Sequence, residues 1–339
     1  MSKGMKKMVN LQKLKLDFWD GKYKVEHKDS EGKIQKAEKQ FYFDEEGIKI
    51  AIKRALGDFT DRTEKLKPES GYKSFGVEEK FKVLCGNDGK GCDKPEKDSF
   101  VHCFVDYFFE NPDKFKNEKD FNKWHYKMCK KFLKVIKPKY QGDIKYGKAQ
   151  KIVNMTFKNA YCLKGKENEN SEEFYTHCHM PLDSIVLEWV NRTQAFTKEN
   201  GNKEYLRKGR IPSWSKMNYE EKTDFKPAGG KPYYGYSDIQ KAIFIYFDKY
   251  VNEKNIATKY LKGYTPLQAE FFVWKYMQFE IAAEGVYNQL TSFEDWNDQK
   301  RKEKIKKFKE ETINKKLEFL HDKFENIEKY KVPEERSEN

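Results

Sequence analysis

Two lysines in a largely apolar segment are the first candidates for chemistry in this sequence. Residues 146–162 read YGKAQKIVNMTFKNAYC. Helical spacing places Lys151, Asn154 and Lys158 on one side of a helix, which we predict to be an exposed polar stripe. The other side, predicted to pack in the core, carries Ala149, Ile152, Val153, Thr156 and Ala160. A lysine surrounded by apolar groups can lose its proton and then act as a nucleophile.

The second candidate is a carboxylate further along the chain. Residues 180–190 read MPLDSIVLEWV, in which Asp183 precedes an apolar run. Its residue type and position predict a helix N-cap, accepting a hydrogen bond from a first-turn N–H. The helix dipole keeps such a carboxylate ionised and the cap fixes its direction, as catalysis also requires. The sequence leaves both roles open.

Two further segments combine basic and aromatic residues suited to nucleic acid. Residues 226–236 read KPAGGKPYYGY, and here Lys231 could meet phosphate while tyrosine rings stack on exposed bases. A turn whose tyrosines pack inward explains the same residues equally well. Residues 207–210, RKGR, precede Trp214 and offer phosphate contacts. The contacts expected there are Arg207, Lys208 and Arg210.

Composition indicates a folded chain with a polyanionic partner. The 339 residues include 68 Lys and Arg against 55 Asp and Glu, a formal net charge of +13. Aromatic residues make up 16%, too many for a disordered chain. Nucleic acid is the leading partner for such a charge.

The sequence predicts neither a membrane segment nor a secretory signal. No apolar run approaches the roughly 20 residues that a spanning helix needs. The basic N-terminal residues lack an apolar core and a small-residue cleavage site. The six cysteines have no framework spacing and are predicted to be reduced thiols. We therefore expect a cytoplasmic protein.

Periodicity predicts a mainly α fold with a small N-terminal α/β portion. Residues 10–43 form one hairpin or two short strands around the turn DSEG, and Asp44 caps a helix. Residues 57–75 and 86–98 are polar and turn-rich. Helices are then predicted at 99–110, 119–136, 148–163, 183–196, 237–254, 265–283, where Thr265 and Pro266 mark the start, and 293 to about 330.

We divide the chain into three parts. Residues 1–98 are the α/β portion, 99–290 a helical catalytic core and 291–339 a long amphipathic C-terminal helix and tail. A hairpin near 138–147 separates two helices of the core. Such a hairpin can turn backbone N–H groups toward a phosphate, which makes Gly142, Gly147 and Lys148 candidate nucleic-acid contacts.

The hairpin, the lysine helix and the capping aspartate together resemble the helix-hairpin-helix DNA glycosylases. The segments GKAQKIVN (147–154) and MPLDSIV (180–186) are similar to those of 8-oxoguanine DNA glycosylases, nearer the archaeal type. The resemblance implies a helix-hairpin-helix core, with Lys151 as the Schiff-base lysine and Asp183 as the catalytic carboxylate. Asn154 would be the supporting polar residue, and Lys158 the substitute nucleophile if Lys151 points to solvent. The two hairpin glycines stand five residues apart, wider than is usual in the family.

These roles fit the chemistry of base excision. A carboxylate stabilises the positive charge that develops at the sugar C1′ as the glycosidic bond breaks. A neutral lysine attacks C1′, and the resulting Schiff base permits strand cleavage by β-elimination. The target base is flipped between aromatic walls. Candidates for these walls are Tyr161, Trp189, Trp214, Tyr233, Tyr234 and Tyr236. The reaction requires neither metal nor cofactor.

We therefore predict a DNA glycosylase, with AP-lyase activity as an option, that excises a damaged or modified base. A hypermodified phage base removed in antiviral defence is one such substrate. The alternative is a non-catalytic nucleic-acid-binding protein in which Lys151 and Lys158 meet phosphates and Asp183 only caps. A metal-dependent nuclease is third, based on the D-x-K of GDIK at 142–145. A zinc site at the HCH triplet 177–179 is not expected, because adjacent residues on an extended chain point to opposite sides.

Overall fold

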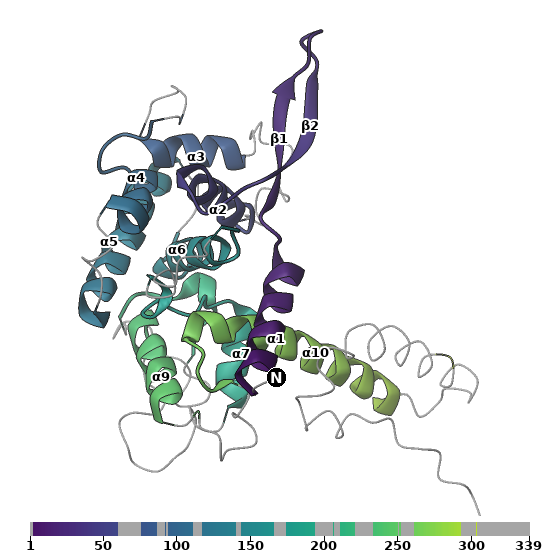
Figure 1. The fold of residues 1–339 in the computed structure, drawn as a ribbon. Coiled ribbons are helices and arrows are strands. Elements are labelled where there is room, and N and C mark those ends of the chain that lie inside the picture. Colours follow the sequence, from purple (N-terminus) through teal and green to yellow (C-terminus); the bar gives the residue numbers. More distant parts are fainter. Residues whose placement is uncertain are drawn as a thin grey trace, which may run out of the picture.

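The computed structural model of the chain is mainly helical, with one small antiparallel sheet near the N-terminus (Figure 1). It describes residues 3–59, 76–86, 92, 94–110, 117–139, 144–165, 174–193, 206, 211–220, 233–249, 251, 261–292 and 303. For residues 3–10, 139, 279 and 282–292 the description is limited to the backbone. Within these ranges no helix is both long and apolar enough to cross a membrane.

The N-terminal elements are α1 (Lys3–Phe18), strands β1 (Lys22–Lys28) and β2 (Ile34–Gln40), α2 (Glu45–Gly57) and α3 (Val77–Cys85). The strands pair from Lys22 opposite Gln40 to Lys28 opposite Ile34. Asp29 closes the turn by accepting from the N–H groups of Glu31 and Lys33 at 3.0 and 2.8 Å. The hairpin predicted around DSEG is thus confirmed, and it projects away from the helices (Figure 1).

The remaining helices follow the predicted order. They are α4 (Phe100–Val105), continued by a π-helical turn η2 (Asp106–Glu110), then α5 (Glu118–Ile136), α6 (Tyr146–Tyr161), α7 (Ser184–Arg192), α9 (Tyr236–Lys249) and α10 (Pro266–Ser292). Two short 3₁₀ segments are η4 (Lys137–Lys139) and η6 (Trp214–Lys216). Helices α1 and α3 were not predicted, and α10 is longer than expected. The predicted helix at 293–330 lies outside the described residues, as do residues 140–143 of the hairpin near 138–147.

Side-chain caps explain where several helices begin. Asp44 accepts from the N–H of Gly47 at 2.7 Å at the start of α2, as predicted. At the start of α10, the Thr265 hydroxyl accepts from the N–H of Gln268 at 3.3 Å. The Gln268 side chain in turn accepts from the N–H of Thr265 at 2.9 Å, which completes a capping box.

Helix α6 lies at the centre of the core. Residues 152–161 are all buried, since α2 and α5 pack along the helix (Figure 1). Asn159 also ties it to α2 by donating to the carbonyl oxygen of Ala51 at 3.1 Å. The apolar face predicted for this helix is confirmed. One continuous core runs from Leu11 to Met277, on both sides of the boundary predicted at residue 98. None of the six cysteines, all of which the structure describes, forms a disulfide bond.

Candidate functional site

Asp183 is the N-cap of α7, with both carboxylate oxygens engaged. Its Oδ1 accepts from the N–H groups of Ile185 and Val186, each at 2.9 Å. Its Oδ2 accepts from the indole N–H of Trp274 in α10 at 3.2 Å. The backbone of Asp183 is extended, as an N-cap requires. The carboxylate is therefore held in one direction while remaining partly exposed.

Lys151 lies on α6 beside an indole ring. Its Nζ is 4.9 Å from the centroid of Trp214, a cation–π distance, and both side chains are half-buried. Trp214 reaches this position because its segment packs directly on the first turn of α6. A Cβ on Gly147 would lie 1.6 Å from the carbonyl oxygen of Trp214, so only glycine permits this approach.

Gln150 joins the lysine and aspartate segments. Its Nε2 donates to the carbonyl oxygens of Gly147 and Leu182, each at 2.9 Å. Its Oε1 accepts from the N–H of Leu182 at 3.4 Å. Gln150 precedes Lys151 and Leu182 precedes Asp183, so these bonds bring the two predicted residues into one region. The two side chains, both described, do not form an ion pair with each other.

Lys158 does not belong to an exposed stripe. Its side chain is 3% exposed and its Nζ lies 2.5 Å from Oε2 of Glu270, itself 2% exposed. The Nζ also lies over the rings of Phe18 and Phe271, at 4.0 and 4.7 Å from their centroids. Burial raises the pKa of Glu270, and Lys158 opposes that rise, as Lys151 does more weakly. The predicted exposure of Lys158 is wrong, and its ion pair leaves the amine closed to a substrate in this conformation.

Asn154 is fully buried as well, because it belongs to a polar network inside the core. Its Oδ1 is 2.8 Å from Nε2 of His125. Its Nδ2 donates to the Tyr236 hydroxyl at 2.8 Å and to Oε1 of Gln150 at 2.9 Å. The predicted exposure of Asn154 is therefore wrong. Polar partners from α5 and α9, remote in sequence, satisfy its amide.

The network has one consistent arrangement of protons. The Oδ1 of Asn154 can only accept, so His125 donates from Nε2 and accepts at Nδ1 from the Tyr146 hydroxyl at 3.3 Å. His179 likewise lies between the Tyr236 hydroxyl, at 2.8 Å from Nδ1, and Oδ1 of Asn122, at 2.5 Å from Nε2. Both imidazoles are neutral, since burial lowers the pKa of His125 to about 4 and that of His179 well below its usual value.

The predicted aromatic walls divide by burial. Tyr161 and Trp189 are each 5% exposed and Tyr236 is fully buried. In this structure their rings are part of the hydrophobic core. Tyr161 accepts from the Gln268 amide at 2.9 Å, and Trp189 packs edge-on against Tyr246. The half-buried rings are those of Trp214, Tyr233 and Tyr234. Of these, Trp214 lies beside Lys151.

The predicted phosphate contacts can be placed in part. The N–H of Gly147 donates to the carbonyl oxygen of Met217 at 2.9 Å, so in this structure a phosphate cannot use it. Lys148 is half-buried, with its Nζ 5.6 Å from the ring centroid of Phe59. The other predicted contacts lie outside the described residues; they are Gly142, Arg207, Lys208, Arg210 and Lys231.

The structure adds residues that the sequence did not single out. Glu270 and Trp274 come from α10 and meet Lys158 and Asp183 through tertiary packing alone. No local pattern marks them, because their partners lie roughly 90 to 110 residues earlier in the chain. In the described part of the chain, no group of three or more His, Cys, Asp or Glu side chains is arranged to hold a metal ion.

Comparison with known proteins returned no relative. No protein-family model, curated protein or solved structure matches the chain.

Proposed function

We propose that this protein is a DNA N-glycosylase that removes a damaged or modified base, with Asp183 and Lys151 as its catalytic pair. The observation that carries the proposal is the pair of Gln150 hydrogen bonds to Leu182, which bring the lysine and aspartate segments together. The helix-hairpin-helix fold assignment, the phage-base substrate and a cytoplasmic site of action rest on the sequence and belong to the same proposal.

Each residue has a defined task in this reaction. Asp183 stabilises the positive charge at C1′ as the bond to the base breaks and its electron pair leaves with the base. The hydrogen bonds from two backbone N–H groups and from Trp274 hold its carboxylate in place. Lys151 is partly exposed; its ammonium proton passes to solvent water, and the amine nitrogen then attacks C1′. The open-chain Schiff base that follows can undergo β-elimination, which cleaves the strand.

Borohydride trapping tests the proposal. The protein is incubated in EDTA with oligonucleotides that carry damaged or modified bases, and covalent adducts and released bases are measured. We expect an adduct with the wild type and none with Lys151→Gln. Lys24→Gln, an exposed lysine on the β-hairpin, is the control and should retain the adduct.

A second variant isolates the carboxylate charge. Asn is as good an N-cap as Asp, so Asp183→Asn keeps α7 capped while removing the negative charge. The Asn amide nitrogen cannot accept from the indole N–H of Trp274, so we expect a loss of stability of about 1 kcal/mol. Base release should fall by at least a hundredfold, the scale of one electrostatic group in a catalytic site. Binding without base release in the wild type would instead support a non-catalytic nucleic-acid-binding protein. Nicking that disappears in EDTA would support the nuclease.

A further inference from the structure

Six lysines form a straight row along the outer face of α5 and into η4. We call them the lysine row, and they are Lys119, Lys123, Lys127, Lys130, Lys134 and Lys137. Successive members are four, four, three, four and three residues apart, which places them on one helical face. All six are exposed. At 1.5 Å per residue the row extends over about 27 Å, and Figure 1 shows α5 at the outer edge of the molecule.

An ordinary solvated helix face does not explain this row. Such faces usually alternate charges so that residues three and four apart attract, whereas neighbouring lysines repel. The two acidic residues of α5, Glu118 and Asp120, both lie in its first turn, and none follows between residues 121 and 139. The hairpin lysines show the usual pattern, since Lys33 and Lys36 pair with glutamates at 2.8 and 3.2 Å.

Among the residues that the structure describes, acidic side chains therefore compensate little of the row's charge. In the described part of the chain, Lys123 has an ion pair, with Asp120 at 3.6 Å. Two carboxylates at one end cannot neutralise six ammonium groups. An extended polyanion with regularly spaced charges, namely a sugar–phosphate backbone, complements a row of this length and sign.

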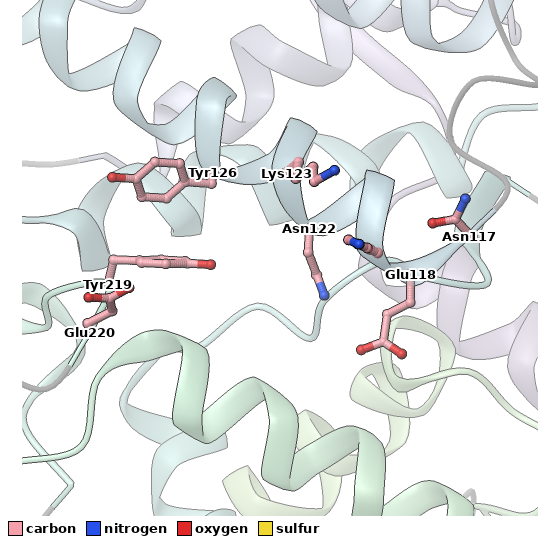
Figure 2. Close-up of a pocket in the computed structure, with 8 residues that line it drawn as sticks. Asn117, Glu118, Asn122, Lys123, Tyr126, Tyr219 and Glu220 are labelled. Atoms are coloured by element: carbon pink, nitrogen blue, oxygen red, sulfur yellow. The ribbon is translucent and has the colours of Figure 1, made fainter.

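A pocket of about 840 Å³ opens beside the N-terminal half of the row (Figure 2). Its wall includes Lys119 and Lys123 of the row, the tyrosines Tyr126 and Tyr219, Asn122, and the two carboxylates Glu118 and Glu220. The two tyrosine rings contact each other with centroids 4.5 Å apart and planes tilted by 54°. An aromatic wall next to ammonium groups is the combination that binds bases of single-stranded nucleic acid. The volume is within the usual range for small-ligand sites.

The buried network fixes how Asn122 faces this pocket. Its Oδ1 accepts from Nε2 of His179, whose Nδ1 is occupied by the Tyr236 hydroxyl. The hydrogen bond from His179 therefore fixes the orientation of the Asn122 amide. Figure 2 shows the amide nitrogen at the end of a side chain that points away from α5. An N–H donor held in this way can bond to a carbonyl oxygen or ring nitrogen of a base.

We propose that the lysine row binds the backbone of a single-stranded DNA segment and that the pocket holds one of its bases. The row supplies affinity through phosphate contacts, and Asn122 and the tyrosines contact the base. This binding surface uses neither Lys151 nor Asp183. It would serve the proposed glycosylase or a non-catalytic binder, and binding assays test it independently of base release.

The salt dependence of binding tests the row. Each phosphate contact to a single strand contributes about 0.7 to the slope of log K against log salt. The triple variant Lys127→Gln, Lys130→Gln, Lys134→Gln should therefore lower the slope for a fluorescent 12-nucleotide thymidine strand by about 2. A hairpin triple, Lys24→Gln, Lys28→Gln, Lys36→Gln, removes the same charge and should leave the slope nearly unchanged. Equal effects of the two triples, or tighter binding of a duplex with equal phosphate number, would overturn the proposal.

A base-free strand tests the pocket. The wild type should bind the thymidine strand about tenfold more tightly than a 12-unit abasic strand of equal charge, given the strength of base–aromatic stacking. Asn122→Asp keeps the acceptor for His179 but removes the N–H donor, while Asn117→Asp adds the same charge at the pocket rim and keeps the α5 cap. Asn122→Asp and Tyr219→Leu should lose the preference for the base-bearing strand, and Asn117→Asp should keep it. Equal binding of the two strands by folded wild type would refute the pocket assignment.

Discussion

The ion pair between Lys158 and Glu270 gives the sharpest prediction about stability. The side chains are 3% and 2% exposed, with 2.5 Å between Nζ and Oε2. Removing one partner of such a pair leaves an uncompensated buried charge and typically costs about 3 to 5 kcal/mol. We expect Lys158→Met to lower the free energy of unfolding by that amount at pH 7, measured by urea denaturation.

The double variant and an exposed pair provide controls. Lys158→Met combined with Glu270→Leu removes both charges and should recover most of the loss, because well-packed apolar replacements are often neutral. Lys33→Met breaks a 2.8 Å pair on the hairpin whose partners are 70% and 69% exposed, and it should produce no resolvable change. A Lys158→Met variant as stable as Lys33→Met would refute the reasoning.

The pH dependence of Lys158→Met has a defined sign. Burial already raises the pKa of Glu270 in the wild type, and loss of Lys158 removes the charge that opposes the rise. Between the pKa of Glu270 in the unfolded chain and its higher pKa in the folded chain, the native state binds more protons than the unfolded state. The free energy of unfolding therefore falls as pH rises through this range. The cost of Lys158→Met should therefore shrink between pH 7 and pH 5. A cost that stays constant or grows toward pH 5 would contradict the assignment.

Two further predictions concern the core around α6. Burial lowers the pKa of His125 from 6.5 to about 4, so between these pH values the protein takes up a proton when it unfolds. The free energy of unfolding, measured by urea denaturation, should therefore fall by about 3 kcal/mol from pH 7 to pH 4. The fall should be smaller in His125→Asn. Gly147→Ala should destabilise by several kcal/mol and displace Trp214, seen as lower melting temperature and altered tryptophan fluorescence. Gly57→Ala, whose new Cβ meets nothing within 4 Å, should be close to neutral.

Local sequence signals were sufficient for much of the helical framework. Asp44, Asp183 and the pair Thr265 and Pro266 mark helix starts, since a capping side chain satisfies N–H groups within its own first turn. The β-hairpin at DSEG could likewise be predicted from local sequence, because Asp29 satisfies N–H groups only two and four residues away. Helices α1 and α3 were not predicted, because lysines and glutamates interrupt the helical pattern of their few apolar residues.

The lysine row was also present in the sequence, since its spacing can be read directly from residues 119–137. Its significance depends on α5 having one buried and one exposed face. The buried face carries Phe121, Trp124, His125, Met128, Cys129, Phe132 and Ile136.

The sequence by itself determined the mainly helical class, the caps, the hairpin and the apolar face of α6, because each depends on residues within a few positions. Tertiary structure alone decided the environments of the polar residues on α6. Lys158 meets Glu270 from 112 residues away and Asn154 meets Tyr236 from 82 residues away. Helical spacing gives the direction of a side chain but not what lies opposite, and a buried partner can satisfy a polar group as fully as water does.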